Sequence, residues 1–252
     1  MVLTEYPLLV FVLSTVMLWI SEHAGARLRG PKPALEKDEQ ADLGMLLAGA
    51  LTLLGLIIGF TFSMAIARYD QRKSSEAAEA ASIGTEYLRA SLLPVADAGK
   101  VRDLLRKYLA QRMLFYTTRD TDELDQLEAT TSQLESELWS AIQAPVPSQL
   151  PPSVGVTVTG MNDVFNSRTY THSAWLNRIP RAAWILMVAI ALCCTALIGY
   201  STRGTTASTR LFLVLPLIVS IAFFLIADID SPRRGVIRVP PLNLVALSRT
   251  LR

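Results

Sequence analysis

Charged side chains gather where a long uncharged stretch of the sequence ends. Residues 43–67 carry no charge, and the segment that follows holds Arg68, Asp70, Arg72 and Lys73. Basic side chains at the mouth of a membrane pore favour anions, whereas at the end of a single membrane helix they bind lipid headgroups. The cluster therefore indicates either the cytoplasmic mouth of a pore or an ordinary helix anchor, with Asp70 paired to a neighbouring cation.

A second charged cluster follows the last apolar stretch. Asp228 and Asp230 precede Arg233 and Arg234 in the sequence ADIDSPRRGVIRV. Carboxylates can bind Ca²⁺, but this ion takes six to eight oxygen ligands. Two carboxylates beside two arginines are better explained as structural salt bridges, so we predict no metal site here.

The other residue types that could carry chemistry predict no catalytic site. Cys193 and Cys194 are adjacent within an apolar run, where they are expected to be small lipid-embedded side chains, and His23 and His172 are far apart in the sequence. The sequence has no glycine-rich phosphate loop and no nucleophile with a nearby histidine pattern. We therefore predict neither an enzyme nor a bound cofactor.

The composition indicates a membrane protein with a sizeable water-exposed part. Of 252 residues, 51% are hydrophobic and 18% are charged, whereas soluble domains average about 25% charged residues. The net charge of +2 is too small to indicate a nucleic-acid partner.

Four segments are apolar enough to cross a bilayer, which takes about 20 helical residues. They are residues 6–20, 43–67, 182–200 and 211–227. A signal peptide is the alternative for the first segment, because Ala24-Gly25-Ala26 resembles a cleavage site. No Lys or Arg precedes that apolar run, which favours a membrane span.

The predicted fold is an all-α integral membrane protein with four transmembrane helices and a helical cytoplasmic insert between spans two and three. We expect a first span and external loop (1–42), a second span (43–69), the insert (70–180), spans three and four (181–228) and a tail (229–252). About eleven Lys and Arg residues flank the spans on the side of the insert and tail, against about six on the other side. This bias predicts an inner (plasma) membrane protein with both termini in the cytoplasm.

The insert has the periodicity of amphipathic helices. One apolar stripe runs from Val101 to Phe115, and a leucine-rich stripe runs from Leu124 to Ile142. These stripes suit an antiparallel or intersubunit helix pair and equally suit core packing within one subunit. Residues 144–155, with four prolines, are predicted to be a linker.

The second span is predicted to continue as one helix until Pro94, well into the cytoplasm. One of its faces collects small residues, including a GxxxG pattern at Gly55 and Gly59 with Thr52 and Ser63 on either side. Helix packing inside one subunit explains this face. Alternatively, a ring of such helices lines a pore, and then three apolar residues would narrow it: Ile58, Phe62 and Ile66.

Several motifs resemble the bacterial bestrophin-like membrane proteins of unknown function. They are GFTFSMAIARYDQRK (59–73), EAASIGTEYLRASLLP (79–94), LLRKYLAQRMLFY (104–116), NRIP (177–180) and DIDSPRRGVIRV (228–239). Bestrophins themselves, which this family distantly resembles, are pentameric anion channels whose second span lines the pore with apolar residues four apart. The resemblance implies such a neck at Ile58, Phe62 and Ile66, but the bestrophin calcium clasp is not matched.

Two functions from different classes follow. The first is an oligomeric channel, a pentamer by analogy, that lies in membrane lipid. It passes small inorganic anions through a pore lined by the second span. The second is a non-conducting scaffold or sensor that acts through its cytoplasmic helices. The lack of strongly polar residues in the second span favours the scaffold, although a wide pore could leave ions hydrated.

Overall fold

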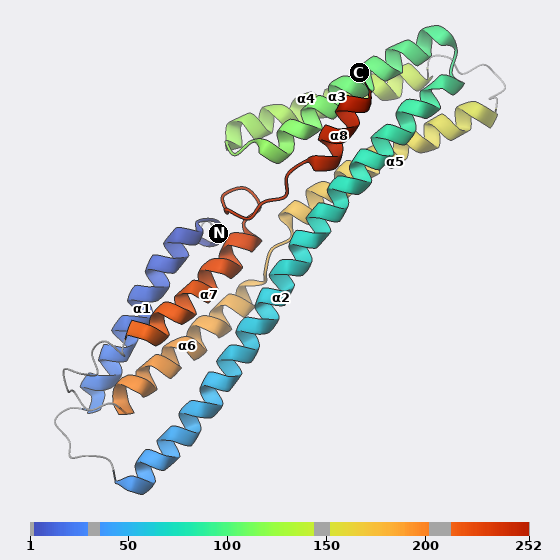
Figure 1. Cartoon of the computed structure of the whole chain (residues 1–252). Helices are drawn as coiled ribbons and strands as arrows, with labels where there is room; N and C mark the ends of the chain where they lie inside the picture. Colours follow the sequence, from blue (N-terminus) through green and yellow to red (C-terminus); the bar gives the residue numbers. More distant parts are fainter. Residues whose placement is uncertain (1–2, 30–35, 144–151, 202–212, 252) are drawn as a thin grey trace. The chain divides into compact units, whose positions relative to one another are not determined.

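The computed structural model is built from helices (Figure 1). It describes residues 3–29, 36–143, 152–201 and 213–251, and every regular element in these ranges is a helix. In chain order the elements are η1 (Leu3–Glu5), α1 (Pro7–Arg29), α2 (Lys37–Arg89), η2 (Ala90–Leu92), α3 (Val95–Thr117), α4 (Thr121–Gln143), α5 (Pro152–Leu176), α6 (Arg181–Ser201), α7 (Val214–Asp230) and α8 (Leu242–Thr250). The predicted all-α class is confirmed.

The chain divides into two compact units. Unit 1 comprises Met1–Ala67 and Arg178–Ile237, and unit 2 comprises Arg68–Asn177 and Arg238–Arg252. Helix α2 belongs to both, and the division inside it falls at Arg68, the first charge after the uncharged stretch. The apolar and the polar parts of the sequence therefore fold as separate bodies.

Unit 1 contains a bundle in which α1 packs against α6 and α7. Leu18, Met187 and Phe223 are almost completely buried in it. Glycines bring two backbones together: a Cβ atom on Gly25 would lie 1.9 Å from the Ala196 carbonyl oxygen, and one on Gly199 would lie 1.8 Å from that of Glu22. Small residues permit such close helix contact in membranes.

Three helical stretches are long and apolar enough to cross a membrane: Pro7–Arg29, Asp38–Leu92 and Val154–Ser201. Helix α7, which holds the described part of the fourth predicted span, has 17 residues. Helix α1 continues beyond the predicted end of the first span at residue 20. In this added part, Ser21 and Arg29 bond to α6: the Ser21 hydroxyl donates a hydrogen bond to the Leu192 carbonyl oxygen at 2.8 Å, and Arg29 donates to the carbonyl oxygens of Tyr200 and Ser201.

Helix α2 is one unbroken helix of 53 residues. At 1.5 Å per residue this is about 80 Å of helix. It begins at Lys37, earlier than predicted, and gives way to η2 before Pro94. The prediction that nothing interrupts this helix between the membrane and Pro94 is confirmed up to Arg89.

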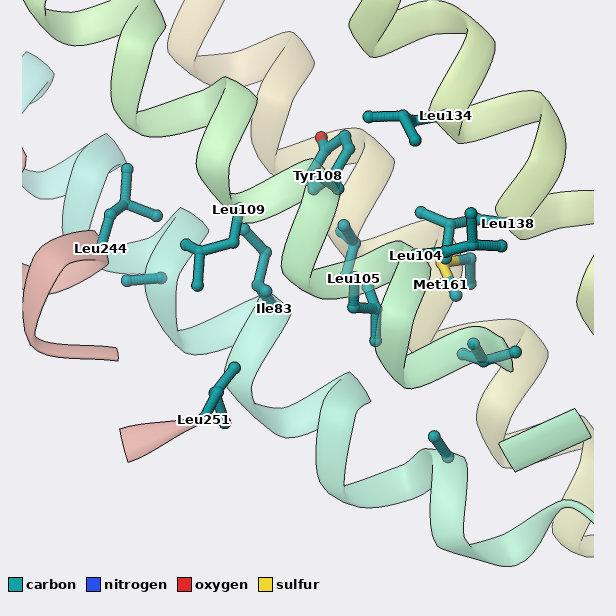
Figure 2. Packing of buried hydrophobic residues seen from close by; sticks show 14 of the residues in the cluster. Ile83, Leu104, Leu105, Tyr108, Leu109, Leu134, Leu138, Met161, Leu244 and Leu251 are labelled. Carbon is teal, nitrogen blue, oxygen red and sulfur yellow. The ribbon is translucent and has the colours of Figure 1, made fainter. Parts of the chain in front are cut away.

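Unit 2 has the main hydrophobic core of the chain (Figure 2). Helices α3 and α4 form a packed pair, and α3 also contacts α8. Leu105, Tyr108, Leu138 and Ile142 are fully buried there. Both predicted apolar stripes therefore serve packing within the chain, which was one of the two possibilities that their spacing left open.

The predicted linker ends earlier than expected. Helix α5 begins at Pro152, so residues 152–155 are helical. Proline is favoured at the first position of a helix because its missing N–H has no partner there in any case. The rest of the predicted linker, residues 144–151, lies outside the described residues.

The close contact of α1 with α6 predicts that Gly199→Ala destabilises unit 1 by about 2 kcal/mol. The added Cβ atom would meet the backbone of Glu22, which cannot move aside as a side chain can. Thermal unfolding of the protein in detergent micelles measures this loss.

Gly99→Ala in α3 is the control, since nothing described lies within 4 Å of its Cβ position. Alanine should stabilise that helix by up to about 1 kcal/mol. Equal effects of the two variants would contradict the packing role of Gly199.

Candidate functional site

The described chain leaves most of the membrane half of α2 exposed. Only 6% of its apolar window is buried. The buried side chains, Leu54, Thr61 and Ala65, are spaced to lie on one side of the helix. On the opposite side, Leu56 is 53% exposed and Phe60 is 63% exposed. This face is therefore free to contact lipid, water or another copy of the chain.

The predicted small-residue face lies in the uncovered part of the helix. Outside their own helix, no described atom lies within 4 Å of the Cβ positions of Gly55 and Gly59, so the GxxxG pattern packs against no other helix among the described residues. Thr52 and Ser63 are also exposed. The Thr52 hydroxyl donates to the Ala48 carbonyl oxygen at 2.8 Å, so its oxygen remains available as an acceptor.

The three predicted constriction residues are less exposed than Phe60. Phe62 is 36% exposed and Ile66 is 39% exposed, and Ile58 is half-buried. Phe60, which the sequence analysis left out, is the most exposed aromatic residue of this helix half. A periodicity of four identifies a stripe but gives no information on which stripe the rest of the chain covers.

The four charged residues that follow the membrane half differ in their surroundings. Arg72 is 1% exposed, and its Nε donates to the Ala174 carbonyl oxygen at 3.4 Å. Arg68 donates to the Asn177 side chain, whereas Lys73 and Asp70 are exposed. Arg72 is therefore a buried structural cation in this chain, and Lys73 is the cation of this cluster that faces outward.

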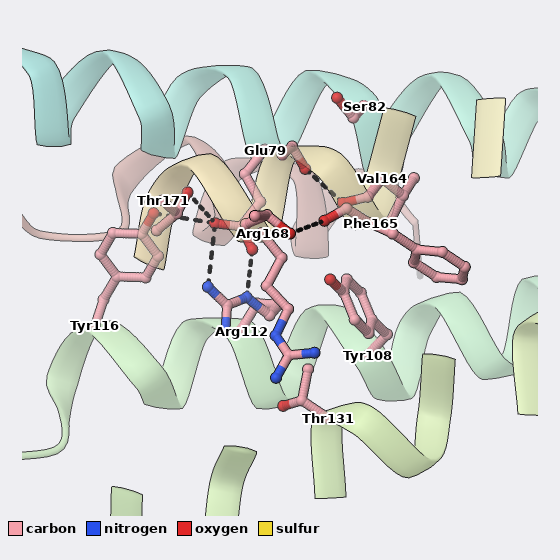
Figure 3. Close-up of polar contacts among 12 residues, drawn as sticks. Glu79, Ser82, Tyr108, Arg112, Tyr116, Thr131, Val164, Phe165, Arg168 and Thr171 are labelled. Carbon is pink, nitrogen blue, oxygen red and sulfur yellow. Dashed lines mark hydrogen bonds and ion pairs between the residues drawn. The ribbon is translucent and has the colours of Figure 1, made fainter. Parts of the chain in front are cut away.

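The polar part of α2 carries buried carboxylates that the sequence analysis did not single out. Glu79 is fully buried and forms an ion pair with the buried Arg112 of α3 (Figure 3). The hydroxyls of Tyr116 and Thr171 each donate to Glu79 Oε2 at 3.1 Å. One carboxylate thus joins α2, α3 and α5.

Burial and charge act in opposite directions on Arg112. Burial alone would lower the pKa of its guanidinium, but the Glu79 carboxylate attracts and hydrogen-bonds the charged form. The net result is a raised pKa, so Arg112 stays charged in the core. Burial also raises the pKa of the Tyr116 hydroxyl, which keeps it a hydrogen-bond donor to Glu79.

A second carboxylate of α2 holds the last helix. Glu76 accepts hydrogen bonds from the Asn243 amide at 2.8 Å and the Leu244 amide at 2.9 Å, at the N-terminus of α8. At the other end of α8, Arg106 Nε donates to the Leu251 carbonyl oxygen at 2.8 Å. An acid at the N-terminus and a base at the C-terminus both complement the helix dipole.

Arg168 of α5 bridges two carboxylates of α4, Glu128 and Glu135. Burial disfavours both charges. For Glu128 the hydrogen bond and charge of Arg168 outweigh burial and lower the pKa, whereas for Glu135 burial prevails and the pKa is raised. The bridge therefore fixes α5 against α4.

The segment after α7 is organised by backbone hydrogen bonds. The Asp228 carboxylate accepts from the amides of Val236 at 2.7 Å and Ile237 at 2.8 Å, and Asp230 accepts from the Ile179 amide at 3.2 Å. The Arg234 guanidinium lies over the Tyr6 ring, 4.3 Å from its centroid. The contacts that we describe for these residues are thus with backbone and an aromatic ring, and salt bridges of Asp228 or Asp230 with Arg233 stay a prediction.

A signal for the buried carboxylates is present in the sequence. Glu76, Glu79 and Glu86 recur at helical spacing on the same side of α2 as Ile83 and Ala90. Acidic residues on an apolar face need partners, and Arg112 lies on the apolar face of α3.

The salt bridge expected for Asp70 is not formed within the described part of the chain.

The Bestrophin-like domain family matches residues 10–244. A crystal structure of a bacterial bestrophin homolog from Klebsiella pneumoniae is 13% identical, has a TM-score of 0.61 and covers 97% of this chain and 96% of its own. A variant of a homolog from the same organism is 14% identical, with a TM-score of 0.59 and 96% of both chains covered. At such identities the likeness establishes the fold alone. No curated protein sequence matches the chain.

The buried ion pair predicts that Arg112→Met destabilises unit 2 by about 4 kcal/mol, because Glu79 keeps a buried charge without its partner. Chemical unfolding followed by the circular dichroism of the purified protein measures this loss.

Arg119→Met is the control, since Arg119 is exposed in the same unit. It should cost about 0.5 kcal/mol or less. An Arg112 variant as stable as the Arg119 variant would show that the buried pair does not hold the three helices.

Proposed function

Because the chain belongs to the Bestrophin-like family, we propose that it forms an oligomeric ion channel for small anions, lined by α2. The observation that carries this proposal is the uncovered membrane half of α2. The rest of the chain covers only one narrow side of this helix. Such a helix is suited to form the inner wall of a ring of copies. Bestrophins, the pentameric channels that the family resembles, supply the analogy for five copies.

The proposed topology has four spans, with α7 as the fourth. The chain then spans the inner (plasma) membrane, and both termini and unit 2 lie in the cytoplasm. The excess of Lys and Arg on that side supports this orientation. The proposal also makes the chain a channel protein rather than an enzyme.

The exposure of α2 suggests a revised constriction. In a ring, the residues opposite the side that packs on the same chain point to the pore axis. On α2 these are Ser63, Thr52 and Leu56, with Phe60 beside them, since Leu54, Thr61 and Ala65 are buried. Apolar rings at Leu56 and Phe60 would gate by excluding water.

The constriction residues that the sequence predicted do not line the proposed pore. Phe62 and Ile66 lie at the side of the proposed pore face, where they and the open Gly55 and Gly59 would contact the neighbouring copy. Ile58 is half-buried and lies nearer to the covered side. A close α2–α2 contact needs small residues of this kind.

The preference for anions is proposed to come from cations at the cytoplasmic end of the pore. Lys73 is exposed, whereas Arg68 lies seven residues after the buried Thr61, on the covered side of α2, and donates to the Asn177 side chain. A ring of such charges attracts anions and repels cations. Arg72 is left out of this ring, because its side chain is buried.

A non-conducting scaffold remains the second candidate, and one observation favours it. Within unit 2, α2 and α5 enclose a groove of about 690 Å³. Serines 74, 75 and 82, Thr85 and Asn166 line it. A groove with polar side chains on a cytoplasmic helix pair is suited to binding a partner protein, which is what a non-conducting scaffold requires.

The channel proposal predicts that Phe60→Ala raises anion flux from liposomes that contain the purified protein. Phe60 is the larger of the two proposed apolar side chains, so its removal would lower the barrier to water and ions. A decrease of about 1.4 kcal/mol in this barrier gives a tenfold rise in flux. Phe62→Ala should have a smaller effect, because Phe62 is proposed to face the neighbouring copy.

Leu186→Ala is the control, since this α6 side chain is 50% exposed on a helix that we place outside the pore. In the same liposomes, Lys73→Glu should shift the preference from chloride towards potassium. Absence of flux from every variant, with correct insertion demonstrated, would contradict the channel and favour the scaffold.

A further inference from the structure

Two cavities of unit 1 adjoin each other at one end of its bundle. The first, of about 280 Å³, is lined by Thr4, Glu5, Arg178, Ile179, Arg181, Trp184 and Ile185. The second, of about 400 Å³, is a groove between α1 and α6. Thr4, Trp184 and Ile185 line both cavities, so a single elongated molecule could occupy the two together.

The first cavity has the chemistry of an anion site. Arg181 is exposed and makes no hydrogen bond or ion pair within the described parts of the chain. Arg178 donates to the Asp230 carbonyl oxygen and lies 3.9 Å from Glu5, whose carboxylate opposes an anion. Two guanidinium groups against one carboxylate leave a net positive charge in this cavity.

The second cavity is suited to a hydrocarbon chain. Its walls are aliphatic or aromatic apart from Ser14 and Thr4: Val10, Leu13, Met17, Leu18, Val188, Ala189, Leu192 and Phe223. The Ser14 hydroxyl donates to the Phe11 carbonyl oxygen at 3.1 Å, so it needs no further acceptor. Thr4 stands at the junction with the first cavity, and its hydroxyl makes no hydrogen bond within the described residues.

We propose that the two cavities form one binding site for a phospholipid with an anionic headgroup. The phosphate lies beside Arg181 and Arg178, and one acyl chain lies in the groove between α1 and α6. The Thr4 hydroxyl and Trp184 are at the level of the glycerol esters. This site goes beyond the proposed channel and does not depend on it.

The position of the site selects a lipid over a soluble anion. Arg181 and Trp184 belong to the first turn of α6, where an apolar helix begins, and tryptophan and arginine are enriched at this depth of a bilayer. A soluble phosphate compound would leave the apolar groove empty. A lipid fills both cavities, and each buried CH₂ group adds to its binding.

Native mass spectrometry of the purified protein tests the site. The full chain in detergent is titrated with phosphatidylglycerol, with phosphatidylcholine and with glycerol 3-phosphate. We expect retention of phosphatidylglycerol, with Arg181→Gln about fivefold weaker, the loss expected for one basic residue at a membrane surface. Ala189→Phe, which fills the groove, should weaken retention of both lipids.

Arg119→Gln is the matched control, because it removes the same charge from an exposed position of unit 2. Equal losses in Arg181→Gln and Arg119→Gln would overturn the proposal, as would undiminished lipid retention in Ala189→Phe. Binding of glycerol 3-phosphate as strongly as the lipid would identify a soluble-anion site and also overturn it.

Discussion

The buried charge of Glu79 is the constraint on which unit 2 depends. A carboxylate without water is tolerated only where cations and hydroxyls replace its hydration, and here α3 supplies Arg112 and Tyr116 while α5 supplies Thr171. These donors come from positions 33 to 92 residues further along the chain. The hydrophobic core of α3 and α4 surrounds this group, and Glu76 extends the same principle to α8.

The same helix presents a different requirement in unit 1. Its membrane half is apolar around most of its circumference, yet the described chain buries only a narrow side of it. Open glycines occur on the uncovered part, where a purely lipid-facing helix has no need for them. In the proposed ring, neighbouring copies cover the glycines while Leu56 and Phe60 face the axis, which is why the channel proposal centres on this helix.

Much of the fold follows from the sequence, because helical periodicity and the positions of prolines are local properties. The unbroken α2, the α3 and α4 stripes and the apolar spans could all be predicted in this way. Which side of α2 is covered could not, since that depends on residues distant in the sequence. Arg72 illustrates this: its acceptor is the carbonyl of Ala174, 102 residues away, and no local pattern distinguishes it from the exposed Lys73. The helical spacing of Glu79 with Glu76 and Glu86 is visible in the sequence, but its partners Arg112 and Thr171 lie 33 and 92 residues away and could not be predicted from it.

The most direct test of the central claim is the structure of the purified protein in lipid nanodiscs by single-particle cryo-electron microscopy. The account predicts a closed ring of copies in which α2 is innermost and Phe60 points to the axis. A monomer, or an oligomer in which the Phe60 face of α2 contacts lipid, would contradict it.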